Sequence, residues 1–448
     1  AVLALAVGLA LWAVSRSGPD APAAGAPGGA AAGTAAILRI GGAKSFAVEL
    51  APAMAKAYLE ALEVRDVEVQ KLDTYRFTVR GMKGGKPWVI AVEGMNTPDG
   101  FAELAAGRLD VAMAGRRIRP EWQQKLDAFG PMTTPGREHV VALSGVAVIV
   151  NPDNRVPQLD RKQLAEVFGG AVADWSGVGG QASPIHVYAG DEKLGLTELF
   201  RNLVLEKIPY APEARRLASP QEINDAVAQD PQGIGYVTLP FVRGTRAVPV
   251  SEGGEPPLVP TAFTLATEDY FLSHRLYFYT LPRPDNPHLP RFVQFALGPE
   301  GQAVVKRSGY VELSVATAPR EPPRGAPAEY VRLTGGAIRL SSTFRFEPAS
   351  SDFDARALVD LERVTAYLIE NRLNGADVRV LGFTDSQGVP AANQGLSLSR
   401  AEQVAKALAQ RGITGVAVAG FGAALPVASN QTAPGRERNR RVEIWIAR

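Results

Sequence analysis

An acidic and a basic residue near the C-terminus, Asp385 and Arg400, have the spacing of a small-molecule site. The apolar stretch 378–381 predicts a short strand, and the turn residues of 382–388 place Asp385 in the loop at the carboxyl end of that strand. A helix is expected soon afterwards, with Arg400 at its start. One carboxylate and one guanidinium would then face the same small molecule, which would suit a zwitterion.

The expected helix has recognisable signals at both ends. Ser399-Arg400-Ala401-Glu402 has the S-x-x-E form of a capping box, apolar residues recur at helical spacing through Leu408, and Gly412 stands where a C-terminal cap would be. Arg400 would lie in the first turn, where a cation faces the positive end of the helix dipole at a cost of about 0.3–1 kcal/mol. This cost predicts an anionic ligand group opposite Arg400.

These residues belong to a longer series of motifs, T-D-x-x-G, Asn393, L-S-x-x-R-A and the closing G-R-x-x-N-R-R-V-E. With them, the stretch 331–448 resembles the C-terminal domain of the outer-membrane protein A family, an α+β domain of βαβαββ order that binds peptidoglycan. In that family an Asp and an Arg hold the amine and the carboxylate of diaminopimelate in the stem peptide. The resemblance implies these roles for Asp385 and Arg400, with Thr384 and Asn393 beside them. The alternative is a surface ion pair worth under about 1 kcal/mol.

A second candidate site lies in the N-terminal half. A strand is expected at 37–40 and a helix at 47–62, joined by the tight loop Gly41-Gly42-Ala43-Lys44-Ser45-Phe46. A glycine turn that leads into a helix N-terminus can cradle an anion. Further strands at 91–93 and 109–114, with a helix between them, predict an α/β unit with a mostly parallel sheet, and such sheets bind ligands at the carboxyl ends of their strands.

The stretch 37–315 resembles the substrate-binding proteins of phosphate ABC importers, which have a two-lobed type II periplasmic-binding-protein fold. The likeness rests on L-D-V-A-M-A-G-R, I-H-V-Y-A-G-D-E-K-L-G-L-T-E-L-F, Q-G-I-G-Y-V-T-L and G-P-E-G-Q-A-V-V-K-R-S-G-Y-V-E-L. The phosphate loop of that family reads R-D-x-x-S-G-T, whereas the matching stretch 190–196 keeps only Asp191 and Gly195. Loss of one charged donor to a buried anion costs roughly 2–5 kcal/mol, so we expect weak or altered anion specificity.

Other residues could compensate for the lost donors. The candidates for this ligand site are Lys44, Ser45, Phe46, Thr97, Arg116, Asp191, Lys193 and Gly195, with Arg117 as a further source of positive charge. The cations among them could equally be ordinary surface residues. Leu194 and Leu196 are either core residues at a helix start or signs of an apolar, degenerate pocket. In the second case the two lobes would serve as a scaffold or a partner-binding module.

Composition narrows the classes of function. The chain is 46% hydrophobic and 21% charged, which is the composition of a globular protein, and its 448 residues are too many for a single core. The net charge of +2 argues against a nucleic-acid-binding protein. The chain has no cysteine, so disulfides and thiolate metal sites are excluded, and its 4 histidines lack metal-ligand spacing. The arginines of 436–441 precede an alternating apolar strand, which again does not favour nucleic acid. We expect no metal, no cofactor and no enzymatic activity.

The remaining segments complete the expected order of domains. The apolar stretch 1–17 predicts a truncated signal or membrane-anchor segment, and an Ala/Gly/Pro linker follows at 18–36. A Pro-rich linker at 316–330 separates the two-lobed domain from the C-terminal domain. These features predict an exported protein of the periplasm or cell envelope. The expected partners are peptidoglycan and a small anion such as phosphate, and the first segment could anchor the protein in the inner membrane.

Two further local predictions concern the C-terminal domain. The stretch 338–346 predicts an extended strand pair, after which Asp352 or Asp354 would cap a helix. That helix would bury one apolar face, made of Leu358, Leu361, Val364, Leu368 and Ile369.

Overall fold

The strand β6 (Glu138–Val150) is 13 residues long and buried along almost its whole length. Its run of Val, Ala, Leu and Ile is typical of a strand that is covered on both faces. In the computed structural model, the first part of β6 pairs with β13 (Ser273–Thr280) and the last part with β10 (Gly233–Thr238), and the change of partner falls between Gly145 and Val146. We call the parts of the sheet before and after this point lobe 1 and lobe 2.

The structure describes residues 36–192, 194–282, 285–346, 353 and 355–447. These residues belong to one compact unit, which begins at Ala36. The expected N-terminal segment at 1–17 lies outside the described residues, as do most of the first linker, Lys193, Asp352 and Asp354. Among the described helices, none is both long enough and apolar enough to cross a bilayer.

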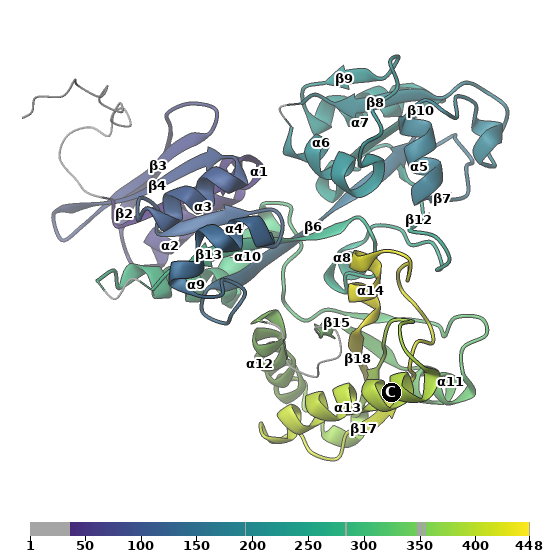
Figure 1. Cartoon of the computed structure of the whole chain (residues 1–448). Helices are drawn as coiled ribbons and strands as arrows, with labels where there is room; N and C mark the ends of the chain where they lie inside the picture. Colours follow the sequence, from purple (N-terminus) through teal and green to yellow (C-terminus); the bar gives the residue numbers. More distant parts are fainter. Residues whose placement is uncertain (1–35, 193, 283–284, 347–352, 354, 448) are drawn as a thin grey trace, which may run out of the picture. The chain divides into compact units, whose positions relative to one another are not determined.

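Lobe 1 has the strand order β2-β3-β4-β1-β5-β13-β6 (Figure 1). The strands not yet given are β1 (Leu38–Ala43), β2 (Arg65–Lys71), β3 (Arg76–Lys83), β4 (Lys86–Met95) and β5 (Val111–Ala114). The helices are α1 (Lys44–Val48), α2 (Leu50–Ala61), α3 (Thr97–Ala105), α4 (Pro120–Lys125), α9 (His288–Leu297) and α10 (Pro299–Arg307). Since β1 is parallel to both β4 and β5, α1 and α3 start at the same edge of the sheet.

Lobe 2 continues the sheet in the order β6-β10-β8-β9, and β11 (Arg246–Ala247) also pairs with β6. Its other elements are β8 (His186–Gly190), β9 (Arg215–Leu217), α5 (Arg161–Phe168), α6 (Gly195–Phe200) and α7 (Pro220–Gln229), with the small pair β7 (Leu159–Asp160) and β12 (Val250–Ser251). The chain returns to lobe 1 through α8 (Ala262–Ala266), whose Leu265 packs on β6 at Gly145.

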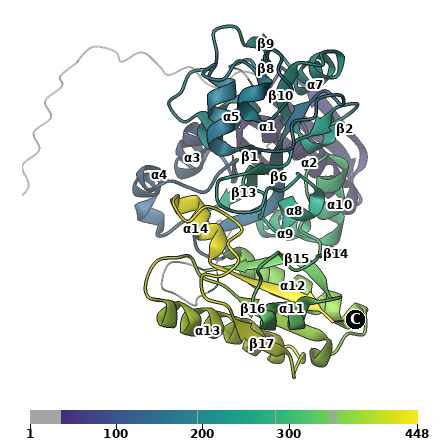
Figure 2. The ribbon, with the colours of Figure 1, turned by 90° about the vertical axis from the view of Figure 1, so that its right-hand side faces the viewer.

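The C-terminal domain has its own sheet of order β14-β15-β18-β16-β17. The strands are β14 (Thr317–Pro319), β15 (Ile338–Arg345), β16 (Val378–Gly382), β17 (Ala417–Gly420) and β18 (Arg441–Ile446), and the helices are α11 (Ala328–Thr334), α12 (Ala355–Glu370), α13 (Pro390–Ala409) and α14 (Ala433–Asn439). Apolar residues of α12 and α13 pack with those of β15, β16 and β18 in one core. A second, aromatic cluster joins Tyr330, Phe383, Phe421 and Trp445. Figure 2 shows α12 and α13 alongside this sheet.

The fold confirms the predicted class, a two-lobed α/β domain followed by an α+β domain, but several local predictions are wrong. The stretch 338–346 holds one strand, β15, and not a strand pair. The expected linker at 316–330 contains β14, which pairs with β15, so part of it belongs to the sheet. On α12, Leu358 is 39% and Ile369 59% exposed, whereas the other three residues of the predicted face are buried.

The largest correction concerns the helix that carries Arg400. It starts at Pro390 and not at Ser399, because Pro is favoured in the first turn and the residues that follow are mostly good helix formers. The predicted capping box therefore lies inside α13.

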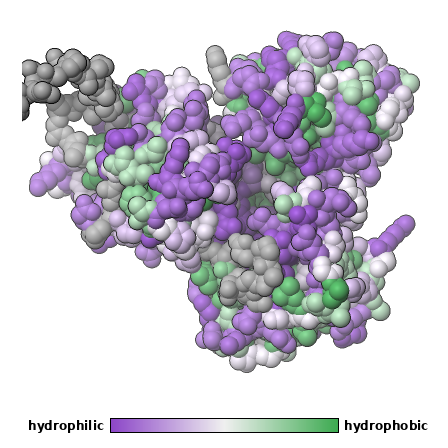
Figure 3. Space-filling view, in the orientation of Figure 1, coloured by the Kyte–Doolittle hydropathy of each residue, from purple (hydrophilic) through white to green (hydrophobic). Residues whose placement is uncertain are grey.

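Hydrophilic side chains prevail on the face of the molecule shown in Figure 3, and the hydrophobic residues there form separate patches.

Candidate ligand-binding sites

The loop after β16 holds Asp385 in a buried position, with 7% of the residue exposed. Its Oδ1 accepts a hydrogen bond from Gln387 N at 2.9 Å, and its Oδ2 accepts one from Arg440 Nη1 at 3.0 Å. Asn393, on the first turn of α13, donates from Nδ2 to the Asp385 carbonyl at 3.4 Å. The structure thus brings together Asp385 and Asn393, which the resemblance places side by side.

Arg400 lies in the middle of α13 and is fully buried. Its guanidinium stands 5.3 Å from the ring centre of Phe346. Burial, and then the charge of Arg440, lower the pKa of Arg400 to about 10, although the charge of Asp385 acts in the opposite direction. The three charged residues therefore act on one another electrostatically. The prediction that Arg400 faces a helix N-terminus is wrong. The charge of Arg400 is instead disfavoured by burial and by the neighbouring cation Arg440.

Arg440 is the residue of this cluster that sequence reasoning missed. It pairs with Asp385 and also donates from Nε to the Phe346 carbonyl at 3.1 Å. In the antiparallel pairing of β16 with β18, Gly382 lies opposite Val442, so the residue before β18 lies beside the residues after β16. The signal in the sequence that could have indicated Arg440 is the closing motif N-R-R-V-E, because the strand that it begins pairs with the strand before Thr384-Asp385.

Two glycines let α13 approach the sheet closely enough to fix Arg400. A Cβ atom on Gly382 would lie 2.0 Å from the Ser397 carbonyl oxygen, and one on Gly420 would lie 2.5 Å from Leu398 N. Beside them, Thr384 is 4% exposed, and its Oγ1 has no hydrogen-bond partner among the described residues. An enclosed hydroxyl in this position is a potential donor to a ligand.

The second candidate site is where the two lobes touch. A Cβ atom on Gly195, at the start of α6, would contact Cβ and Oγ of Ser45, in α1, at 3.4 Å. Arg116 of lobe 1 forms an ion pair with Glu198 of lobe 2, at 3.8 Å between Nη2 and Oε1. Burial, and then the charge of Arg119, lower the pKa of Arg116. Three of the predicted residues therefore lie where lobe 1 contacts lobe 2, namely Ser45, Arg116 and Gly195.

The other predicted residues of this site differ in their surroundings. Lys44 Nζ stands over the ring of Tyr75 at 5.2 Å, and Thr97 begins α3. Asp191 is partly buried, and its N–H donates to the Leu217 carbonyl at 2.8 Å. Phe46 is fully buried against Phe278 and Tyr310, so its side chain belongs to the core and not to a ligand site. Arg117 donates to the buried Glu138 at 3.1 Å.

The comparisons with known proteins follow this division of the chain. Residues 29–300 match the PBP superfamily domain. The chain belongs to the PBP superfamily. Residues 345–440 match the OmpA family, and this stretch contains Asp385, Arg400 and Arg440.

Curated relatives and solved structures match the PBP domain. The phosphate-binding protein PstS of Staphylococcus saprophyticus is 29% identical over 240 residues, which are 52% of this chain and 73% of that protein. PstS of Staphylococcus aureus (strain USA300) is 29% identical over 224 residues, 48% of this chain and 67% of that protein. The crystal structure of an ABC-type phosphate transport receptor from Vibrio cholerae matches 61% of this chain and 99% of that one, with 20% identity and a TM-score of 0.47.

The altered loop of the PBP domain is held by a buried hydroxyl network that the sequence did not reveal. Tyr236 OH donates to Thr197 Oγ1 at 3.4 Å, accepts from Gly190 N at 3.2 Å and lies 2.8 Å from Tyr210 OH. Leu196 is 9% exposed and belongs to the main core of the domain. Of the two interpretations of Leu196, the structure favours the core residue. Among the described residues, no group of three or more His, Asp or Glu is arranged to hold a metal ion.

Proposed function

We propose that this protein binds peptidoglycan non-covalently through the Asp385–Arg400 site and presents its PBP domain in the cell envelope as a receptor for a small anion. The observation that carries the first half is the buried cluster of Asp385, Arg400 and Arg440 at the end of β16, within the OmpA-family part of the chain. The carboxylate of Asp385 and the guanidinium of Arg400 are complementary in charge to the ammonium and the carboxylate of diaminopimelate.

The receptor half is supported by the contact of the two lobes at Ser45, Gly195 and Arg116 and by the relatives that are named phosphate-binding proteins. Closure of two lobes around a solute is a common form of hinge motion. The proposal is for a binding protein of the periplasm and not for a catalyst.

Sedimentation of the full chain with purified sacculi tests the peptidoglycan half. The wild-type protein should pellet with sacculi of diaminopimelate type and should stay in solution when an amidase has removed the stem peptides. Asp385→Ala and Arg400→Glu should each abolish pelleting, whereas Glu402→Ala, an exposed acid on the same helix, should not change it. Equal pelleting of all the variants would overturn this half of the proposal.

A second candidate function is an envelope scaffold that is anchored to peptidoglycan and whose PBP domain binds no phosphate. The absence of the Arg, Ser and Thr of R-D-x-x-S-G-T from 190–196 and the burial of Leu196 favour it. Calorimetric titration of inorganic phosphate into the full chain separates the two functions. Micromolar or tighter binding supports the receptor, and the absence of both heat and a thermal shift supports the scaffold.

A further inference from the structure

Glu252, directly after β12 in lobe 2, is a buried attachment point for the C-terminal domain. Its Oε1 accepts from Thr432 Oγ1 at 2.7 Å, and its Oε2 accepts from Arg438 Nη2 at 2.7 Å and from Ser429 N at 3.2 Å. The Glu252 side chain is 5% exposed. A desolvated carboxylate with several donors loses much of its stabilisation when those donors move away.

The same segment, 429–440, also contacts the candidate peptidoglycan site. Asn430 Oδ1 accepts from Ser386 N at 3.0 Å, next to Asp385. Arg440, directly after α14, pairs with Asp385 itself. Both ends of this short segment therefore contact lobe 2 as well as the candidate site. Figures 1 and 2 both show α14 at the end of its domain that faces the two-lobed domain.

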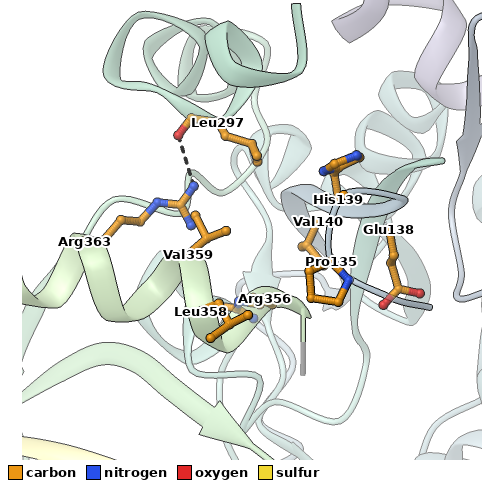
Figure 4. A pocket seen from close by; sticks show the side chains of 10 residues that line it. Pro135, Glu138, His139, Val140, Leu297, Arg356, Leu358, Val359 and Arg363 are labelled. Atoms are coloured by element: carbon orange, nitrogen blue, oxygen red, sulfur yellow. Dashed lines mark hydrogen bonds between the residues drawn. The ribbon is translucent and has the colours of Figure 1, made fainter. Parts of the chain in front are cut away.

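Lobe 1 is attached separately. Arg363 of α12 donates from Nη2 to the Leu297 carbonyl, at the end of α9, at 3.1 Å (Figure 4). A cavity of about 90 Å³ lies beside this contact, and its lining includes His139, Arg356 and Leu358. The C-terminal domain thus holds lobe 1 through α12 and lobe 2 through the segment 429–440.

A third attachment lies at residues 267–272, through which the chain returns from α8 to β13 and which we call the return hinge. The residues before β13 run next to the crossing point of β6, where Tyr270 OH donates to the Val146 carbonyl at 2.8 Å. Here Arg356 pairs with Glu268 at 2.9 Å, and Arg345 donates to the Thr267 carbonyl at 2.9 Å. Opening of the lobes about this hinge would move lobe 2 relative to α12, so it would strain the contacts of Glu252.

We infer that occupation of the Asp385–Arg400 site is energetically coupled to the opening of the two lobes through segment 429–440. Asp385 Oδ2 already accepts from Arg440, so a ligand ammonium competes with that guanidinium. Displacement of Arg440 shifts the end of α14, weakens the Arg438–Glu252 contact and releases lobe 2. Because such coupling is reciprocal, a solute that closes the lobes would weaken peptide binding by the same factor, typically about 5–150-fold. This inference rests on the proposed binding of peptidoglycan.

The absence of cysteine makes a direct test straightforward. Glu60→Cys in lobe 1 and Gln221→Cys in lobe 2, both at exposed positions, allow spin labels to report the distance between the lobes in the full chain. A soluble muropeptide with a diaminopimelate stem is the probe, and calorimetry measures its binding separately. We expect the muropeptide to broaden the distance distribution of the wild-type protein. Glu252→Gln should have a broad distribution from the start, with no further change on addition of muropeptide.

The control is Glu213→Gln, an exposed acid of lobe 2, which should behave as the wild type. An unchanged distribution in wild-type protein that binds the muropeptide by calorimetry overturns the coupling and leaves the proposed function intact. A Glu252→Gln protein with wild-type behaviour also overturns it. The absence of muropeptide binding overturns the proposed function together with the coupling.

Discussion

Arg339 of β15 and Asp269 of the return hinge form an ion pair with 2.6 Å between Nη1 and Oδ2, although 70 positions separate them in the chain. Their side chains are 4% and 1% exposed, so neither charge has water to replace its partner. Burial alone would raise the pKa of Asp269, but the charges of Arg339 and then Arg441 outweigh it, and the pKa lies below its usual value. The pair fixes the C-terminal domain to the hinge of the two lobes.

Removal of one partner of this pair should be strongly destabilising. We expect Asp269→Ala to lower the free energy of unfolding by about 3–5 kcal/mol, since it leaves a buried guanidinium without its main counter-charge. Asp269→Ala combined with Arg339→Leu should recover much of the loss. Urea unfolding followed by circular dichroism measures both. The exposed pair of Asp73 with Arg76 is the control, and Asp73→Ala should have little effect.

A methyl group on Gly382 should disturb the candidate peptidoglycan site without touching its charges. The Cβ of Gly382→Ala would meet the Ser397 carbonyl, so α13 must move away from β16 and carry Arg400 with it. We expect a loss of about 1–3 kcal/mol in stability and weaker sedimentation with sacculi. Gly395→Ala, on the same helix where a Cβ meets nothing within 4 Å, should leave sedimentation unchanged and should not lower stability, because Ala is a better helix former than Gly. Wild-type sedimentation of Gly382→Ala would contradict the role of this close packing.

Arg440 should matter to peptidoglycan binding even though it is absent from the predicted pair. Arg440→Gln removes the ion pair that orients the Asp385 carboxylate, and it also relieves the repulsion that lowers the pKa of Arg400. We expect the affinity for sacculi to change at least several-fold. Arg379→Gln, a partly exposed arginine of β16, should have no effect. Binding curves from sedimentation at several sacculus concentrations give the comparison, and identical curves would argue against a part for Arg440.

Phosphate affinity should depend on Arg116 if the PBP domain is a receptor. Arg116 reaches from lobe 1 to Glu198 of lobe 2, so Arg116→Gln removes both a cation at the lobe contact and an ion pair that favours closure. Loss of a charged donor is worth about 2–5 kcal/mol, which predicts a fall in affinity of tens of times or more. Arg119→Gln, whose side chain is 48% exposed, is the matched control. Equal heats for the wild type and Arg116→Gln would place the phosphate elsewhere.

Two histidines should make the fold sensitive to mild acid. Burial lowers the pKa of His139 and of His274 to about 4, whereas an unfolded histidine titrates near 6.5. Between these values the unfolded chain binds more protons, so stability falls as pH drops from about 6.5 to 4. We expect a loss of about 2–3 kcal/mol per histidine by pH 4.5. Thermal unfolding at pH 7, 5.5 and 4.5 measures it, and the double variant His139→Gln, His274→Gln should show a shallower slope.

The local and periodic features of the chain were readable from the sequence. The strand before Asp385, the α/β order of the first domain and the motifs around 385 and 400 follow from residue types at short spacing, which is why both families were recognised. The start of α13 was misjudged, because the capping signal at Ser399 is local and the helix already begins at Pro390.

What only the tertiary structure decided are contacts between residues far apart in the sequence. Arg440 reaches Asp385 because β16 and β18 pair in an antiparallel register, and register depends on the whole sheet. In the sequence, nothing distinguishes Glu252 from a surface acid, but in the structure lobe 2 and α14 together bury its side chain. Burial, and with it the strength of each charge interaction, depends on how distant elements pack, and no short stretch of sequence contains that information.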